Sequence, residues 1–181
     1  NWESIFSGSA WDFDEKTQQY YLHLFHHKQP DLNWENPEVR HALYDMVNWW
    51  LDKGIDGFRV DAISHIKKYP GMPDLPNPEN LDFVPSFDMH MNQEGIHEFL
   101  KELKEETFDK YDIMTVGEAN GVKIHQADEW VGEQNGKFDM VFQFEHLGLW
   151  GKGADNSVDV IGLKQTLSKW QTELHGNGWN A

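Results

Sequence analysis

The sequence contains no cysteine among its 181 residues. Disulfide bonds are therefore excluded, together with metal and redox sites that depend on thiolates. It also lacks any apolar run approaching the roughly 18 residues that a membrane-spanning helix requires, and it shows no signal peptide. We accordingly expect no membrane partner and a cytoplasmic location.

Basic residues are scarce: 15 Lys and Arg stand against 31 Asp and Glu, which gives a formal net charge of −16. Nucleic acids and anionic membranes would be repelled by such a chain. Aromatic residues are abundant, with nine Trp, eleven Phe and five Tyr. Such rings suit core packing first and stacking on sugars second. We expect a small neutral ligand, no nucleic acid partner and a monomer.

Residues 1–35 are polar and aromatic and show no helical period. Residues 20–25 alternate as a strand does, and they can pair with residues 9–13 across the turn-like residues 14–16. We interpret residues 1–35 as a small irregular β subdomain.

A strong helix start follows at Asn36-Pro37-Glu38, with an N-cap asparagine, proline at the first helical position and an acid in the first turn. The spacing of apolar residues after it predicts one buried face. The residues on that face are Val39, Leu43, Met46, Val47 and Trp50.

Regular segments then alternate along the chain. We predict strands at 55–60, 111–118 and 139–145, and helices at 93–110, 123–133 and 158–174. A proline-rich connection at 64–92 is long enough to suggest a functional loop. The last helix should bury Val160, Leu163, Leu167, Trp170 and Leu174.

This order indicates βαβ units and a parallel sheet. Strands that end in acids and lead into long loops are typical of a (β/α)8 TIM barrel with its site at the C-terminal face. Three strands cannot close a barrel and would leave unpaired edges. The fold class is therefore α/β, a partial barrel of about three central βα units from a larger enzyme.

The predicted strand ends carry the candidate chemistry. Arg59 and Asp61 lie two residues apart, so in a strand they share a face, and the arginine would hold the carboxylate ionised. Glu118 ends the next strand and has no basic neighbour in sequence. Two carboxylates in unlike environments suit glycoside hydrolysis. From spacing alone, a barrel that happens to carry acids at two strand ends is an equally good interpretation.

Longer motifs favour glycoside hydrolysis over a barrel that happens to carry acids at two strand ends. Gly57-Phe58-Arg59-Val60-Asp61-Ala62, Val116-Gly117-Glu118 and Gln29-Pro30-Asp31-Leu32-Asn33 resemble the α-amylase superfamily of glycoside hydrolases. Residues 6–11, 34–36, 170 and 178–180 extend the similarity over almost the whole chain. It is closest to the bacterial α-glucosidase and oligo-1,6-glucosidase branch. The resemblance implies that residues 1–35 are the C-terminal part of a small β subdomain inserted in the barrel, and that residues 36–181 are the central part of the catalytic (β/α)8 barrel, which is incomplete.

The resemblance implies a role for individual residues. Asp61 would be the nucleophile of a covalent glucosyl intermediate, Glu118 the general acid and base, and Arg59 the group that orients the nucleophile and contacts the sugar. Phe25 would form an aromatic wall beside the non-reducing glucose. Phe6 and Phe144 match aromatic residues at the pocket mouth.

Two family motifs fall outside the chain. The third acid should come shortly after Trp179-Asn180, whereas the chain ends at Ala181, and an upstream Asn-His motif precedes Asn1. We therefore expect residues 1–181 alone to be inactive and to fold poorly. Asp31 matches a calcium-binding acid of many α-amylases, but the glucosidase branch usually lacks that site. We expect a salt bridge or turn role for Asp31, no metal and no cofactor.

Linkage preference rests on Ala62 and His65. In this branch the residue after the nucleophile tends to be valine in enzymes acting on α-1,6 bonds and smaller or polar in α-1,4 enzymes; His65 also resembles the α-1,4 pattern. We expect a retaining, exo-acting α-glucosidase that releases glucose from short α-1,4-linked oligosaccharides. The alternatives are an oligo-1,6-glucosidase, a transglycosylase or isomerase, a trehalose-phosphate hydrolase, and a non-catalytic relative such as the heavy subunit of amino-acid transporters.

Overall fold

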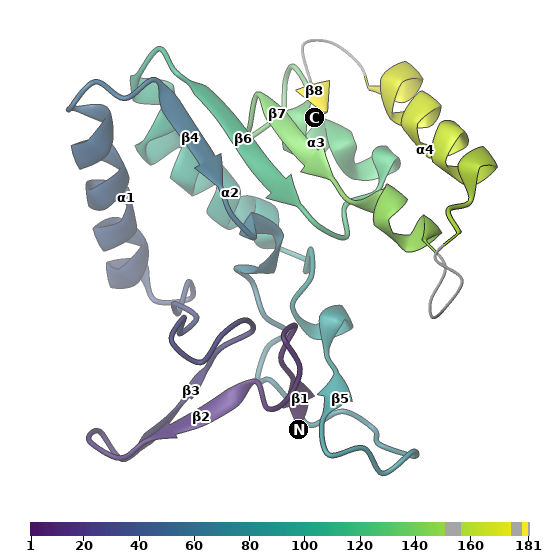
Figure 1. The fold of residues 1–181 in the computed structure, drawn as a ribbon. Coiled ribbons are helices and arrows are strands. Elements are labelled where there is room, and N and C mark those ends of the chain that lie inside the picture. The colour runs from purple at the N-terminus through teal and green to yellow at the C-terminus, as the bar shows by residue number, and fades with distance from the viewer. Residues whose placement is uncertain (151–156, 175–178, 181) are drawn as a thin grey trace.

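The computed structural model describes residues 1–150, 157–174 and 179–180. It has two parts, a parallel sheet flanked by helices and a smaller lobe that contains the N-terminus (Figure 1). The sheet has the order β4 (Gly57–Val60), β6 (Met114–Ala119), β7 (Met140–Gln143) and β8 (Trp179–Asn180), and every pair is parallel. The predicted parallel sheet is confirmed, and β8 adds a strand that the sequence patterns did not indicate.

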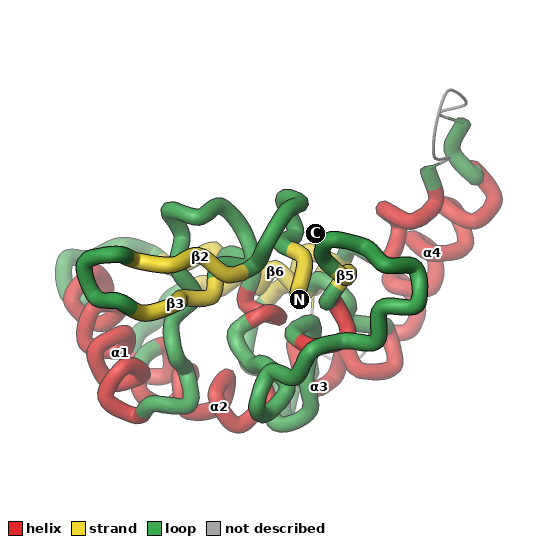
Figure 2. Tube along the Cα trace, turned by 90° about the horizontal axis from the view of Figure 1, so that it is seen from below, coloured by secondary structure: helices red, strands yellow, loops and turns green. Residues whose placement is uncertain are grey.

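The four α-helices of the described residues lie in an arc around the sheet (Figure 2). They are α1 (Pro37–Leu51), α2 (Ile96–Glu106), α3 (Ala127–Val131) and α4 (Val160–Glu173). Buried apolar side chains from the helices and from alternate strand positions fill the space between the two layers. They include Leu100, Leu103, Ala119, Trp130, Val141 and Trp170. This packing leaves the opposite face of the sheet, which carries Glu118, free to form a site.

The start of α1 is confirmed, since the Asn36 side chain accepts a hydrogen bond of 2.9 Å from the Glu38 amide. Its predicted buried face is partly wrong. Met46 and Trp50 are 46% and 44% exposed, and the helix buries Tyr44 instead. The core face is rotated because Tyr44, which an apolar count omits, belongs to the same buried cluster as Leu100 and Leu103 of α2.

The last helix shows the same difference. Trp170 is fully buried, as predicted, but Val160 and Leu167 are 51% and 42% exposed. Helix α4 lies at the end of the described sheet and packs mainly against the 3-10 helix η5 (Glu145–Leu149). Only a narrow stripe of α4 therefore meets the described core.

The predicted helix 93–110 is two shorter elements, α2 and the 3-10 helix η3 (Phe108–Lys110). Thr107 separates them because its backbone leaves the helical region and its hydroxyl donates to the Leu103 carbonyl. The predicted helix 123–133 likewise divides into η4 (Ile124–Gln126) and α3.

Strand β4 begins at Gly57, where a Cβ would lie 1.8 Å from the Met114 carbonyl oxygen, so the close approach of β6 requires glycine.

The smaller lobe contains two pairs of short strands. Strands β2 (Trp11–Asp14) and β3 (Gln19–Leu22) form the predicted antiparallel hairpin with slightly shifted ends. Strand β1 (Trp2–Glu3) pairs in parallel with β5 (Val84–Pro85), which belongs to the long connection 64–92. The 3-10 helix η1 (Ile63–His65) overlaps the start of this connection, and the 3-10 helix η2 (Phe87–Met89) lies within it. The division at residue 35 stays a prediction.

Candidate active site

The guanidinium group of Arg59 bridges the two candidate carboxylates. Its Nη1 lies 3.0 Å from Asp61 Oδ1, and its Nη2 lies 3.1 Å from Glu118 Oε1. The strands that carry these groups are adjacent and parallel, with Val60 in register with Gly117, so their C-terminal ends meet. The interpretation that Glu118 lacks a basic neighbour therefore holds only along the sequence. In space, Arg59 forms an ion pair with both Asp61 and Glu118.

A backbone hydrogen bond also connects the two strand ends. The amide of Ala62 donates to Glu118 Oε2 at 2.7 Å. Ala62 has a left-handed conformation, with φ 47° and ψ 28°, which is uncommon for a residue with a side chain. The sharp turn directly after Asp61 aims this amide at β6. Glu118 is thereby held at both carboxylate oxygens.

The two acids differ in their surroundings. The Asp61 side chain is 71% exposed, whereas that of Glu118 is 17% exposed. Burial, followed by a hydrogen bond with Asp61, raises the pKa of Glu118 above its ordinary value, while the Ala62 amide and Arg59 act in the opposite direction. Glu118 is thus the carboxyl group biased toward holding a proton, which is the property a general acid requires.

An aromatic ring that the sequence patterns did not indicate flanks the bridging arginine. Phe142 is in register with Glu118 on the neighbouring strand β7, and the centre of its ring lies 5.8 Å from the guanidinium carbon of Arg59. This is a cation–π arrangement. Phe144, the predicted site aromatic, lies beyond the end of β7 at the start of η5, and no described ring contact joins it to Arg59. Strict alternation along residues 140–143 could have identified Phe142.

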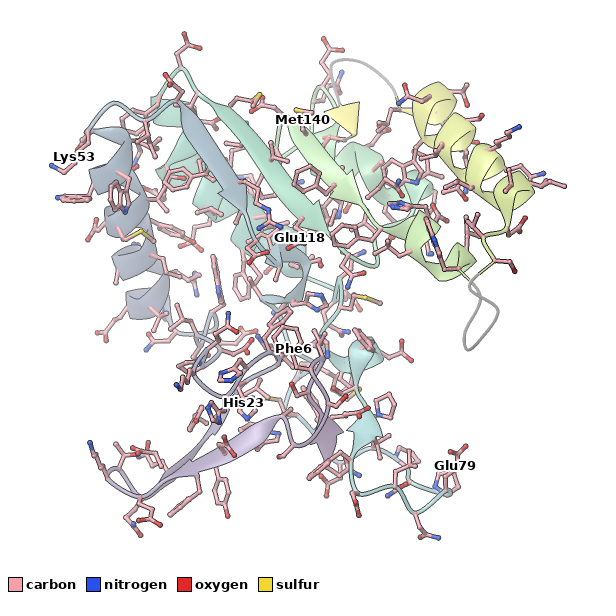
Figure 3. All side chains as sticks on the ribbon, in the orientation of Figure 1. Phe6, His23, Lys53, Glu79, Glu118 and Met140 are labelled. Carbon is pink, nitrogen blue, oxygen red and sulfur yellow. The ribbon has the colours of Figure 1, made fainter. Side chains whose placement is uncertain are left out.

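Three predicted residues form a row of edge-to-face rings. Phe6 and Phe25 have ring centres 5.6 Å apart, and Phe25 and His65 have ring centres 6.0 Å apart. Phe6 is 63% exposed and lies on the small lobe across from Glu118 (Figure 3). The row therefore runs from the exposed rim inward to the turn that follows Asp61.

The inner end of this row is buried. His65 is only 4% exposed, so its ring packs behind Phe25 and is shielded from solvent. Its Nδ1 lies 2.9 Å from Nδ1 of His90, and its Nε2 lies 3.3 Å from Nδ2 of Asn120. Burial is the main cause that lowers the pKa of His65 to about 4 and that of His90 to about 3. His90 and Asn120 carry no sequence signal that could have identified them.

Asp31 forms the salt bridge expected for it. Its Oδ1 pairs with the ammonium group of Lys68, and its Oδ2 accepts a hydrogen bond of 2.8 Å from the Leu24 amide. In the part of the chain that the structure describes, no group of three His, Asp or Glu side chains is arranged to hold a metal ion. Among the same residues, no helix is both long enough and apolar enough to cross a membrane.

The fold and the site define a segment of a parallel β/α protein whose paired carboxylates meet at the C-terminal ends of two strands. The family model "Alpha amylase, catalytic domain" matches residues 1–181, and the chain belongs to this family. The expected fold class, a partial (β/α)8 barrel of the α-amylase family, is confirmed by its solved relatives.

Individual relatives are similar over the whole chain. "Probable oligo-1,6-glucosidase 3" of Bacillus subtilis is 65% identical over 181 residues, which are 100% of this chain and 33% of that protein. An "Alpha-glucosidase" of Pediococcus pentosaceus is 46% identical over 187 residues, with the same coverage. The crystal structure of a Bacillus licheniformis trehalose-6-phosphate hydrolase is 43% identical with a TM-score of 0.85, and it covers 99% of this chain and 32% of that one. The chain thus spans about a third of the length of the relatives it matches.

Proposed function

We propose that the full-length protein is a retaining, exo-acting α-glucosidase. The observation that carries the proposal is the single guanidinium group of Arg59 in contact with both Asp61 and Glu118. In the first step, the Asp61 carboxylate attacks the anomeric carbon while Glu118 gives its proton to the departing glycosidic oxygen. In the second step, Glu118 takes a proton from water, and the water oxygen displaces Asp61.

The closeness of the two carboxyl groups supports retention. An inverting enzyme needs room for a water molecule between them, with a separation of roughly 6.5–9.5 Å, whereas a retaining pair lies about 5 Å apart. Asp61 and Glu118 contact the two terminal nitrogens of one guanidinium group, at 3.0 and 3.1 Å, so the span of Arg59 keeps the two carboxyl groups close together. Such a pair favours direct attack by the carboxylate over attack by an intervening water molecule.

The proposed substrate is a short neutral gluco-oligosaccharide with α-1,4 bonds. A neutral sugar fits the strongly acidic chain, whose net charge is −16. The α-1,4 preference rests on the small side chain of Ala62, next to Asp61, where a valine would crowd the leaving-group side. A preference for α-1,6 bonds is the second candidate, and the name of the Bacillus subtilis relative favours it.

Site-directed variants of the full-length protein test the reaction. Asp61→Asn and Glu118→Gln should each abolish glucose release from maltose, while Asp82→Asn, at an exposed acid outside the site, should keep full activity. Proton NMR of the first product should show α-glucose. Initial formation of β-glucose, or unchanged turnover by Asp61→Asn, would contradict the proposal.

Comparison of substrates tests the finer assignment. Initial rates on maltose should exceed those on isomaltose, and a strong preference for isomaltose would replace the α-1,4 proposal with the α-1,6 one. Free glucose should dominate the products. A predominance of rearranged disaccharides would indicate an isomerase or transglycosylase on the same scaffold.

A further inference from the structure

A buried chain of hydrogen bonds lies directly behind the proposed catalytic pair. It runs from His90, in the long connection, through His65 to Asn120, which is two residues beyond Glu118. His90 and His65 are 1% and 4% exposed, and their ring centres are 5.0 Å apart. None of these contacts touches the carboxylates directly, so their effect on the reaction has to pass through the backbone.

The turn after Asp61 provides that route. The His65 amide donates to the Ala62 carbonyl at 3.0 Å, which closes the turn, and the Ala62 amide on the other side of it donates to Glu118 Oε2. The same turn is joined to the long connection a second time, because the Asn92 amide donates to the Ser64 carbonyl at 2.8 Å. The position of the Ala62 amide therefore depends on how this turn is held.

The pattern of donors and acceptors defines which ring nitrogens of His65 and His90 carry a proton. With Nδ2 of Asn120 as the donor, Nε2 of His65 is an acceptor and carries no proton. The proton of His65 is then on Nδ1, which donates to Nδ1 of His90. His90 in turn carries its own proton on Nε2, a buried atom without a hydrogen-bond partner in the described structure.

We propose that His90 is a positioning residue for the reaction: it fixes the ring of His65 and thereby holds the turn that directs the Ala62 amide at Glu118. Asn120 anchors the same ring to the end of β6, so the two catalytic strands are connected by side chains as well as by the sheet. His90 itself contacts neither the substrate nor the reacting atoms. The assignment rests on the proposed function. It explains which contacts hold Glu118 in its orientation beside Asp61.

A double-mutant cycle on the full-length enzyme tests the coupling. His90→Phe removes the hydrogen bond but keeps a ring, and it should lower kcat/KM for maltose by about tenfold, the effect of one lost buried hydrogen bond. Asn120→Ala should have a similar effect. The double variant should be little worse than either single variant, because both act through His65. Fully additive losses would overturn the proposal.

A conservative replacement of His90 and the pH profile distinguish a positioning role of His90 from a general loss of packing around it. His90→Gln can still pair with Nδ1 of His65, so it should recover most of the lost activity. The Ala62 amide lowers the pKa of Glu118 against the raising effects of burial and Asp61, and Arg59 acts in the same direction as the amide. Release of the turn in His90→Phe should therefore move the basic limb of kcat/KM to higher pH. An unmoved limb together with no rescue by glutamine would refute positioning.

A control variant and a spectroscopic measurement complete the test. His97→Phe replaces a partly buried histidine on α2 that pairs with Glu129, outside this chain of contacts, and it should leave the basic limb in place. In protein labelled with 15N-histidine, the resonances of His65 should indicate a proton on Nδ1 in the wild type, and the Nδ1 resonance should shift in His90→Phe because that proton loses its acceptor. This result does not depend on turnover, so a proton found on Nε2 would overturn the inference even if the enzyme hydrolyses maltose. Absence of hydrolysis with the expected resonances would instead contradict the proposed function.

Discussion

The backbone amide of Ala62 contacts the side chain of Glu118 across two adjacent strands, with 2.7 Å between the nitrogen and Oε2. The residue after the proposed nucleophile thus helps to set the orientation and the proton affinity of the proposed acid. Arg59 adds a second connection between the same two strand ends.

Replacement of the bridging arginine should disable the site without removing its charge. Arg59→Lys places one ammonium group where a planar fork contacts both Asp61 and Glu118, so it can satisfy only one of them well. We expect kcat for maltose to fall at least about a hundredfold, the effect of losing a charge-assisted contact of roughly 3 kcal/mol. Arg40→Lys, at the ion pair with Glu102 on α2, is the matched control and should stay near wild-type activity. Equal effects of the two variants would contradict a bridging role.

The pH dependence of the reaction should reflect the raised pKa of Glu118. Burial and the hydrogen bond with Asp61 extend the pH range in which Glu118 keeps its proton. The basic limb of kcat/KM should therefore lie above the ordinary range of a glutamate. With an activated aryl glucoside, whose leaving group needs no proton, Glu118→Gln should keep measurable glucosylation of Asp61 and lose this limb. Persistence of the limb in the variant would assign it to another group.

Stability should decrease on mild acidification because of the two buried histidines. The pKa values of His65 and His90 are lowered to about 4 and about 3, so both stay neutral in the folded state while the unfolded chain takes up protons below about pH 6.5. Their contribution is complete above pH 6.5 and is lost as the pH falls toward 4, by about 1.4 kcal/mol per pH unit for each histidine.

The urea midpoint measured between pH 7 and pH 4.5 checks this expectation. Replacement of one member of the pair, in His90→Gln, should reduce the slope of stability against pH by about half. His26→Gln, at an exposed histidine, should leave the slope unchanged. A slope that is identical in all three proteins would show that the pair does not stay neutral.

The left-handed backbone at Ala62 means that a substitution made to change the linkage preference also changes the stability of the protein. Valine is strongly disfavoured at φ 47°, so Ala62→Val should destabilise the protein by about 1–3 kcal/mol and also shift the ratio of maltose to isomaltose hydrolysis toward isomaltose. Ala62→Gly relieves the strain and should keep the wild-type ratio. Thermal denaturation and paired initial rates check the two effects separately. An unchanged ratio in a folded Ala62→Val protein would remove Ala62 as the linkage selector.

The sequence allowed the parallel β/α alternation, the helix start at Asn36 and the position of the two carboxylates at strand ends to be predicted. These features depend on local patterns, namely side-chain periodicity, capping and the motifs around Asp61 and Glu118. It did not indicate which helix face is buried, as Met46 and Leu167 show. That face depends on which elements pack against the helix, and hydrophobicity along the chain does not contain this information.

The local motifs establish which residues are available: an arginine and an acid at one strand end, a second acid at another, and aromatic residues in the small lobe. Packing of the elements establishes that Arg59 contacts both acids, that Phe142 rather than Phe144 contacts it, and that His90 lies behind His65. Each of these relationships joins residues far apart along the chain. They arise from strand register and from the path of the long connection, both of which are settled only when the elements pack together.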